Sequence, residues 1–361
     1  MGVFYFLFVV LFLSAILLNR SRGWGFFLIF IMGFICAFRG INVGTDTINY
    51  YMNNFSGESS FDVSTSSLVN WEFGFQLISG IIAQLDFNPR WCVYVLTFIT
   101  YMFLSLAAVR YSKLLGVKIV FVALLYFIMG YYALTFNISR QMAAISIVLY
   151  GYSFLFQDKR KYMYFFIYIL LASSIHISSL IYILFFFIRY VNLSKIDTKL
   201  IIIFSVGLLL FTQLFKDVFL SFIMDKSEAF SLYTKYMQQT EESTVSVAGF
   251  VFEFLKLSLS LYVYCRLNNS VNSLFVNMYL TSIFIDLLFG AFYGNIYRVS
   301  FGFVVIQIIA YAIVLSRRVC DFCPNFSRSI FFFLVVLIYG YESLSSLSRG
   351  AYDIIPYYMT L

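Results

Sequence analysis

The sequence predicts an all-α polytopic membrane protein, and three observations lead to that prediction. Of its 361 residues, 62% are hydrophobic and only 11% are charged, which leaves too little polar surface to cover a water-soluble globule of this size. Apolar stretches of about 15 to 20 residues recur from end to end, each roughly long enough to cross a bilayer as a helix. Basic residues gather between alternate stretches. We therefore expect one integral membrane domain over residues 1–361.

The apolar stretches correspond to about twelve transmembrane helices. In chain order they lie at roughly 2–19, 24–38, 91–109, 119–136, 141–156, 162–175, 177–188, 200–215, 250–265, 274–292, 299–316 and 329–345. The first has no basic residue before it, and Arg20 and Arg22 follow it. It is therefore expected to be a retained span and not a cleaved signal peptide.

The charge distribution predicts the topology. One set of alternate loops collects most of the basic residues with only three acids, Asp158, Asp197 and Asp321. The basic residues of this set are Arg20, Arg22, Arg110, Lys113, Lys118, Lys159, Arg160, Lys161, Arg189, Lys195, Lys199, Arg266, Arg317, Arg318 and Arg328. Such an excess marks the cytoplasmic side. The net charge of +7 thus reflects topology, and nucleic acid is not an expected partner.

Two segments decide whether the loops alternate correctly. Residues 72–85 are expected not to cross but to form a re-entrant or interfacial helix, since one more crossing would move the basic loop at 110–118 outside. Residues 162–188 are expected to form two short spans that meet near His176, and broken spans are where binding sites tend to be built. The long outer loops are 39–71 and 216–249, and the second has the composition of a helix at the membrane interface.

Five arginines map to the outer face or its edge, against the usual inside bias: Arg39, Arg90, Arg140, Arg298 and Arg349. The planar guanidinium group binds phosphate with two parallel hydrogen bonds, although a single interfacial arginine can also simply extend toward lipid headgroups. Several arginines at the mouths of different spans favour an anionic ligand.

Two residues could remove a proton from a substrate. His176 is the only histidine and lies at a span junction among Ser173, Ser174, Ser178 and Ser179; a neutral imidazole there can act as a general base or can be a packed structural group. Asp46 lies in the turn-forming segment VGTDT, near Arg39 and Tyr50.

Other polar groups have simpler interpretations. Glu253 and Lys256 lie three residues apart on one helix and are expected to pair with each other; Asp286 lies inside a span, where an ionisable group needs a partner. The segment CDFC at 320–323 has no further ligands nearby, so no metal site is predicted. The sequence has no P-loop, no dinucleotide-binding glycine pattern, no HExxH and no GxSxG.

An ordered set of short motifs resembles the EpsG-like branch of the Wzy-type polysaccharide polymerases. The motifs are RGxxVGTDTxNY at 39–50, FNxxRQxxA at 136–144, AxxxHxS at 172–178, and the pair Tyr297 and Arg298. Each motif alone is short, and their order and sidedness carry the resemblance. It implies a GT-C-like membrane glycosyltransferase architecture in the bacterial inner membrane.

The resemblance also implies a reaction. Such enzymes polymerise oligosaccharide repeat units linked to undecaprenyl diphosphate at the periplasmic face, transferring the growing chain to the non-reducing end of a new lipid-linked unit. They would need no metal and no cofactor, and their partners would be lipid-linked glycans, membrane lipid, a chain-length regulator and a flippase. An O-antigen ligase, or a flippase or transporter of lipid-linked oligosaccharide, is the alternative.

The resemblance implies roles for individual residues. Arg39, Arg140 and Arg298 would bind the diphosphate, with Arg140 also acting in catalysis. Either His176 or Asp46 would be the base, and the sequence leaves that choice open. The supporting residues would be Gly44, Thr45, Tyr50, Asn137, Gln141 and Tyr297.

Overall fold

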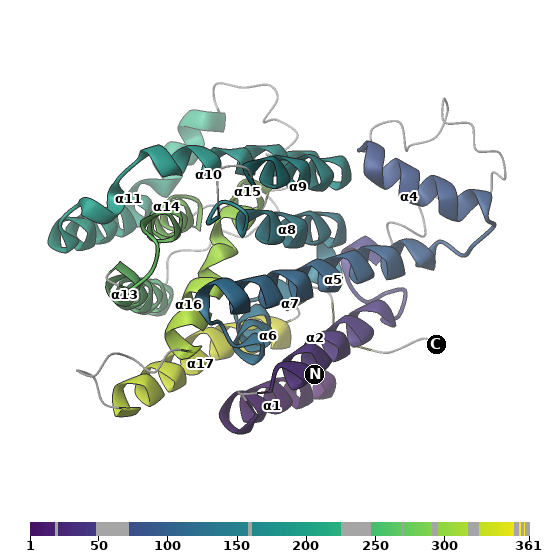
Figure 1. The fold of residues 1–361 in the computed structure, drawn as a ribbon, viewed down its shortest axis with the longest axis horizontal. Coiled ribbons are helices and arrows are strands. Elements are labelled where there is room, and N and C mark those ends of the chain that lie inside the picture. Colours follow the sequence, from purple (N-terminus) through teal and green to yellow (C-terminus); the bar gives the residue numbers. More distant parts are fainter. Residues whose placement is uncertain are drawn as a thin grey trace. The chain divides into compact units, whose positions relative to one another are not determined.

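The computed structural model describes residues 1–18, 21–47, 72–157, 161–224, 247–268, 270–290, 295–316, 325–349, 354 and 357. Every regular element among them is helical, which confirms the all-α prediction (Figure 1). The α-helices are α1 (Gly2–Leu17), α2 (Arg22–Ala37), α4 (Phe73–Gln84), α5 (Arg90–Leu115), α6 (Ile119–Ile128), α7 (Tyr131–Asn137), α8 (Ser139–Tyr152), α9 (Tyr162–Ile175), α10 (Leu184–Phe187), α11 (Thr198–Met224), α13 (Val247–Asn268), α14 (Ser273–Gly290), α15 (Asn295–Val304), α16 (Ile306–Ser316) and α17 (Asn325–Ser348). Three short 3-10 helices complete them: η3 (Ile177–Ile183), η4 (Ile188–Tyr190) and η5 (Leu193–Lys195).

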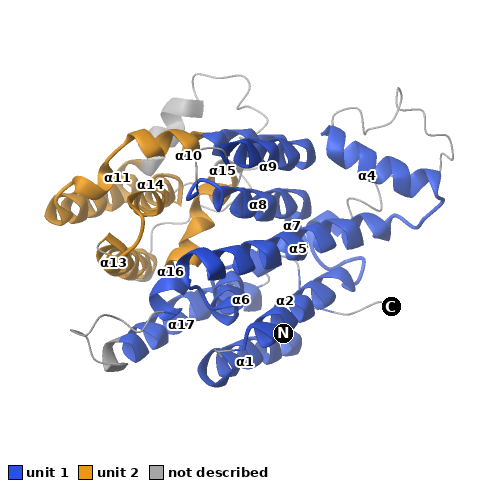
Figure 2. Ribbon diagram, viewed as in Figure 1, with its two compact units in different colours: residues 1–183, 311–361 blue, residues 184–310 orange. Residues whose placement is uncertain are grey.

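These helices form two compact units (Figure 2). Unit 1 comprises Met1–Ile183 and Tyr311–Leu361, and unit 2 comprises Leu184–Ala310. The chain therefore passes from one unit to the other twice, between η3 and α10 and within α16. The expectation of a single integral domain is not tested by this division and stays a prediction.

In unit 1, α8 packs between α5 and α9 (Figure 1). Tyr111, near the end of α5, donates to the carbonyl of Leu149, near the end of α8, at 3.2 Å, so the two helices run in the same direction. α9 returns antiparallel to α8, because Phe165 near its start stacks on Tyr152 at the end of α8. The start of α8 and the end of α9 consequently lie at the same end of the unit.

Five helical segments of the described residues are long and apolar enough to cross a membrane, and α6 with α7, bent by 61°, would make a sixth. The long segments are Arg90–Leu115, Thr198–Phe215, Ser273–Gly290, Tyr297–Ser316 and Arg328–Ser348. Other apolar helices have 10–17 residues, and a helix of 16 residues spans only about 24 Å. The multi-pass character is therefore supported, whereas the number of about twelve spans stays a prediction.

Of the two segments that the topology depended on, one is a single short helix and the other is broken. Residues 73–84 form the 12-residue helix α4, about 18 Å long and too short to cross the hydrocarbon core. The α-helix from Tyr162 ends at Ile175, and His176 adopts an extended conformation (φ −151°, ψ 109°) before η3 begins. The expected break at His176 is confirmed.

Unit 2 contains Glu253, Lys256 and Asp286, three ionisable residues that the sequence places inside spans. Lys256 donates to Glu253 at 2.7 Å, which confirms their expected pairing. Asp286 on α14 accepts a long contact of 3.5 Å from the hydroxyl of Tyr297 and another of 3.5 Å from the amide of Gln307. These contacts supply the partners that the sequence left unassigned.

Candidate functional site

The first part of the site is a turn that packs on the junction between α7 and α8. Gly44 has a left-handed φ of +81°, and a Cβ there would clash with the backbone carbonyl of Phe136, so glycine is required both by conformation and by close approach. The next residue, Thr45, donates its backbone N–H to the side-chain oxygen of Asn137 at 3.0 Å. The motifs at 39–50 and 136–144 therefore meet in space.

Arg39 lies beneath this turn and is only 1% exposed. Its guanidinium donates to Thr47 Oγ1 at 2.7 Å and to Ser139 Oγ at 3.0 Å, and it lies over the ring of Phe136. A further nitrogen approaches the sulfur of Cys36 at 3.1 Å. Because a buried charge needs such partners, the geometry makes Arg39 a buried brace that joins the turn to the start of α8.

Asp46 lies at the N-terminal end of α8. One of its carboxylate oxygens accepts the backbone N–H of Ser139, the first residue of that helix, at 2.7 Å. A carboxylate at this position satisfies one of the unpaired N–H groups of the helix and interacts favourably with the positive end of the helix dipole. The next residue along α8 is Arg140.

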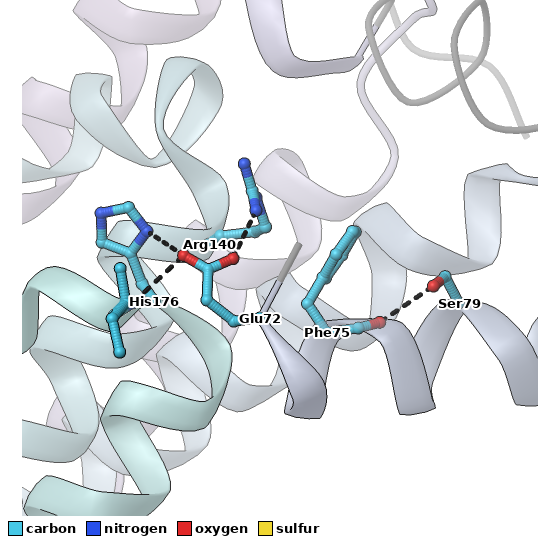
Figure 3. A network of polar contacts seen from close by, with 6 residues as sticks. Glu72, Phe75, Ser79, Arg140 and His176 are labelled. Carbon is cyan, nitrogen blue, oxygen red and sulfur yellow. Dashed lines mark hydrogen bonds and ion pairs between the residues drawn. The ribbon is translucent and has the colours of Figure 1, made fainter. Parts of the chain in front are cut away.

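Glu72 connects the two most informative residues of the sequence (Figure 3). One carboxylate oxygen accepts from Arg140 at 2.8 Å. The other lies 3.2 Å from Nδ1 of His176 and accepts the backbone N–H of Ile177 at 3.1 Å. At His176 the separation is that of a hydrogen bond, but the in-plane N–H direction misses the oxygen, so we describe this contact as electrostatic.

The helix α4 presents Glu72 to these partners (Figure 3). Its start lies so close to the end of α9 that a Cβ on Gly74 would come within 2.5 Å of Ser174 Oγ and 2.7 Å of its backbone oxygen. Phe75, which is fully buried, lies beneath the Arg140 guanidinium, 5.0 Å from ring centroid to Cζ. The site thus depends on tight docking of α4.

The environment of Glu72 keeps its carboxylate ionised. Burial by itself would raise the pKa of this carboxyl, but the contact with His176, the backbone N–H groups of Glu72 and Ile177, and the charge of Arg140 outweigh burial and lower the pKa from 4.5 to about 2. The side chain is 14% exposed, while those of Arg140 and His176 are each 26% exposed. Both partners can therefore be reached from outside while Glu72 stays largely covered.

The structure brings together most of the residues predicted for the site. Asp46, Asn137, Arg140 and His176 lie at one end of unit 1, and Gln141 is buried in the first turn of α8. Arg90, at the start of α5, donates to the carbonyl of Arg39 at 3.1 Å. Tyr297 and Arg298 belong to unit 2, and the side chain of Arg298 is exposed. Tyr50 lies outside the described residues.

Glu72 was not predicted from the sequence as a site residue. The signal for it was an acidic side chain at the first position of the apolar run EFGFQLISGIIAQL, where an ionisable group is unusual and needs a partner. Two of its partners, Arg140 and Ile177, lie 68 and 105 residues further along the chain, and no local pattern connects them.

The helical fold, with its long apolar helices, defines a multi-pass membrane protein. The sequence matches the family model described as the EpsG family over residues 22–359. The chain therefore belongs to the EpsG family, which makes it a membrane protein related to polysaccharides. No curated protein and no solved structure matches the chain.

Proposed function

We propose that the protein is a metal-independent membrane glycosyltransferase that polymerises lipid-linked oligosaccharide repeat units. The donor would be a growing chain on undecaprenyl diphosphate, and the acceptor the non-reducing hydroxyl of a new lipid-linked unit, at the periplasmic face of the bacterial inner membrane. The observation that carries the proposal is that one carboxylate, Glu72, contacts both Arg140 and His176. An anion-binding group and a potential base thus lie on opposite sides of a single side chain.

In this reaction Arg140 would bind the leaving group. As the glycosidic C–O bond breaks, its electron pair goes to the diphosphate oxygen, and a guanidinium held in place favours that developing charge. The partial exposure of Arg140 and its position in the first turn of α8 suit this role, since a helix N-terminus also favours phosphate. Arg39 would support the site from beneath and not through contact with substrate, because it is buried.

His176 is the better candidate for the base. The oxygen of the acceptor hydroxyl attacks the anomeric carbon of the donor, and the hydroxyl proton passes to the imidazole. Asp46 is less suited, since its carboxylate already accepts the first N–H of α8, an interaction that favours the ionised form and makes it a weaker base. We assign Asp46 to holding the start of α8, and with it Arg140.

The number of spans and the GT-C-like architecture belong to the same proposal. About twelve crossings would put Arg140 and His176 on the outer side, together with the start of α8 and the end of α9. A chain-length regulator and a flippase are the expected partners. An O-antigen ligase would use the same two groups, with a finished chain as donor and a different acceptor.

The test uses the purified protein in liposomes with undecaprenyl-diphosphate-linked repeat units. A ladder of products supports the polymerase, and its loss in Arg140→Ala and His176→Ala supports the two assignments. A single transfer to a lipid core would favour the ligase, and movement of the lipid-linked unit across the bilayer without a new bond would favour a flippase. Either of these last two outcomes overturns the proposal.

A further inference from the structure

Glu72 has no direct role in the proposed reaction, but its carboxylate contacts both Arg140 and His176, the two groups that the reaction uses (Figure 3). We propose that Glu72 is a positioning residue, which keeps a proton on Nδ1 of His176 and thereby leaves Nε2 as the atom that accepts the proton of the sugar hydroxyl. This inference rests on the proposed function for its catalytic part, but the position of the proton can be measured without any substrate.

The first argument is the hydrogen-bonding capacity of the carboxylate. An ionised carboxylate only accepts hydrogen bonds, and the 2.8 Å contact with the positive charge of Arg140 favours the ionised form. A lone pair on Nδ1 at 3.2 Å from the same carboxylate would be repelled by it, whereas an N–H there becomes a hydrogen bond after a small rotation of the ring. The proton on a neutral His176 therefore belongs on Nδ1, and Nε2 keeps its lone pair.

The second argument is that Glu72 itself cannot easily move. Its oxygen next to His176 also accepts the N–H of Ile177, the residue that follows the imidazole, at 3.1 Å. The start of α4 is held against Ser174 by the close approach at Gly74. Glu72, His176 and Ile177 are thus joined as one local unit, and the carboxylate sets the orientation of the ring as well as its tautomer.

The third argument concerns charge during the reaction. When Nε2 accepts the hydroxyl proton, the imidazole becomes positive, and a carboxylate next to Nδ1 stabilises that charge. Because Arg140 shares the same carboxylate, the diphosphate and Glu72 both attract its guanidinium. Removal of Glu72 should therefore slow proton transfer and leave binding of the lipid-linked substrate unchanged or tighter.

The experiment uses the fact that the chain contains one histidine. Full-length protein with ¹⁵N-labelled histidine, purified through a tag that contains no histidine and held in nanodiscs, gives imidazole nitrogen signals from His176 alone. We expect the wild-type protein to carry the proton on Nδ1, and Glu72→Ala to shift the population toward Nε2, the tautomer that a free histidine prefers. The side chain of Glu72 does not cap α4, so its removal leaves the helix start intact.

Two further variants separate positioning from folding. Glu253→Ala removes a carboxylate from a glutamate ion pair in unit 2 and should leave both the tautomer and the ladder unchanged. Glu72→Gln keeps an oxygen acceptor but loses the charge, so it should keep the wild-type tautomer while kcat falls at least about tenfold. In Glu72→Ala kcat should fall about 100-fold, with KM changed less than twofold or lowered.

The outcomes distinguish the two proposals. A wild-type tautomer on Nε2, or one that does not respond to Glu72→Ala, overturns the inference whatever the activity. A wild-type kcat in well-folded Glu72→Gln overturns it as well. If the tautomer shifts as expected and the wild-type protein forms no ladder, Glu72 still positions His176 and the polymerase function is wrong.

Discussion

The docking of α4 on α9 leads to a prediction for Gly74→Ala. The new Cβ would lie 2.5 Å from Ser174 Oγ, 2.7 Å from its backbone oxygen and 2.9 Å from its carbonyl carbon. Two of these three atoms belong to the backbone and cannot rotate away. Because carbon atoms pack at about 3.5 to 4 Å, the start of α4 must move by about 1 Å, and Glu72 moves with it.

The expected magnitude follows from the hydrogen bond that this movement breaks. A shift of about 1 Å would stretch the contact between Glu72 and Arg140 from 2.8 Å to beyond hydrogen-bonding distance, and a bond to a charged group contributes about 1.5 to 3 kcal/mol. At about 1.4 kcal/mol per factor of ten, we expect ladder formation to slow between about 10-fold and 150-fold. The helix itself should not be weakened, since alanine is favoured over glycine within helices by up to about 1 kcal/mol.

The chain supplies a matched control for this substitution. Gly23 is the second residue of α2, as Gly74 is of α4, and a Cβ on Gly23 meets nothing within 4 Å. Gly23→Ala should therefore retain the wild-type rate in the same liposome assay and the wild-type signal of His176 in nanodiscs. If Gly74→Ala folds and polymerises as fast as Gly23→Ala, the reasoning from α4 docking to activity is refuted.

Three further predictions concern the same end of unit 1. Arg140→Lys keeps the positive charge and loses the planar guanidinium group. The number of repeat units in the longest products should therefore fall at least about tenfold. A ladder of wild-type length would contradict the assignment of Arg140 to the diphosphate. Gly44→Ala should lower the free energy of unfolding by about 1 to 3 kcal/mol more than Gly116→Ala does. Both glycines have a left-handed φ, but only at Gly44 would the new Cβ clash with a neighbour, the backbone carbonyl of Phe136. Folding lowers the pKa of Glu72 from 4.5 to about 2, so the ionised carboxylate should add up to about 3 kcal/mol to the free energy of unfolding. This contribution should be constant above pH 4.5 and disappear as the pH falls toward 2. If the difference in unfolding free energy between the wild type and Glu72→Gln does not change over that range, the pKa shift is contradicted.

The sequence by itself determined the features that depend on composition and on neighbours along the chain. Low charge and recurring apolar stretches predicted the helical membrane class, and the spacing of three residues predicted the pairing of Glu253 with Lys256. The alternation of basic loops predicted the helix break at His176. In each case the composition or the charge pattern of the sequence was sufficient.

Tertiary structure alone decided what the polar residues do. Arg39, expected to bind a ligand, is buried as a brace beneath the turn at Gly44, because α2 leads it into the junction of α7 and α8. Glu72 is important because the docked helices bring Arg140 and Ile177, which lie 68 and 105 positions further along the chain, to its two carboxylate oxygens. Periodicity describes one helix at a time, whereas the pairing of charges is set by how helices dock, and here a glycine without a side chain lets α4 come close enough to α9.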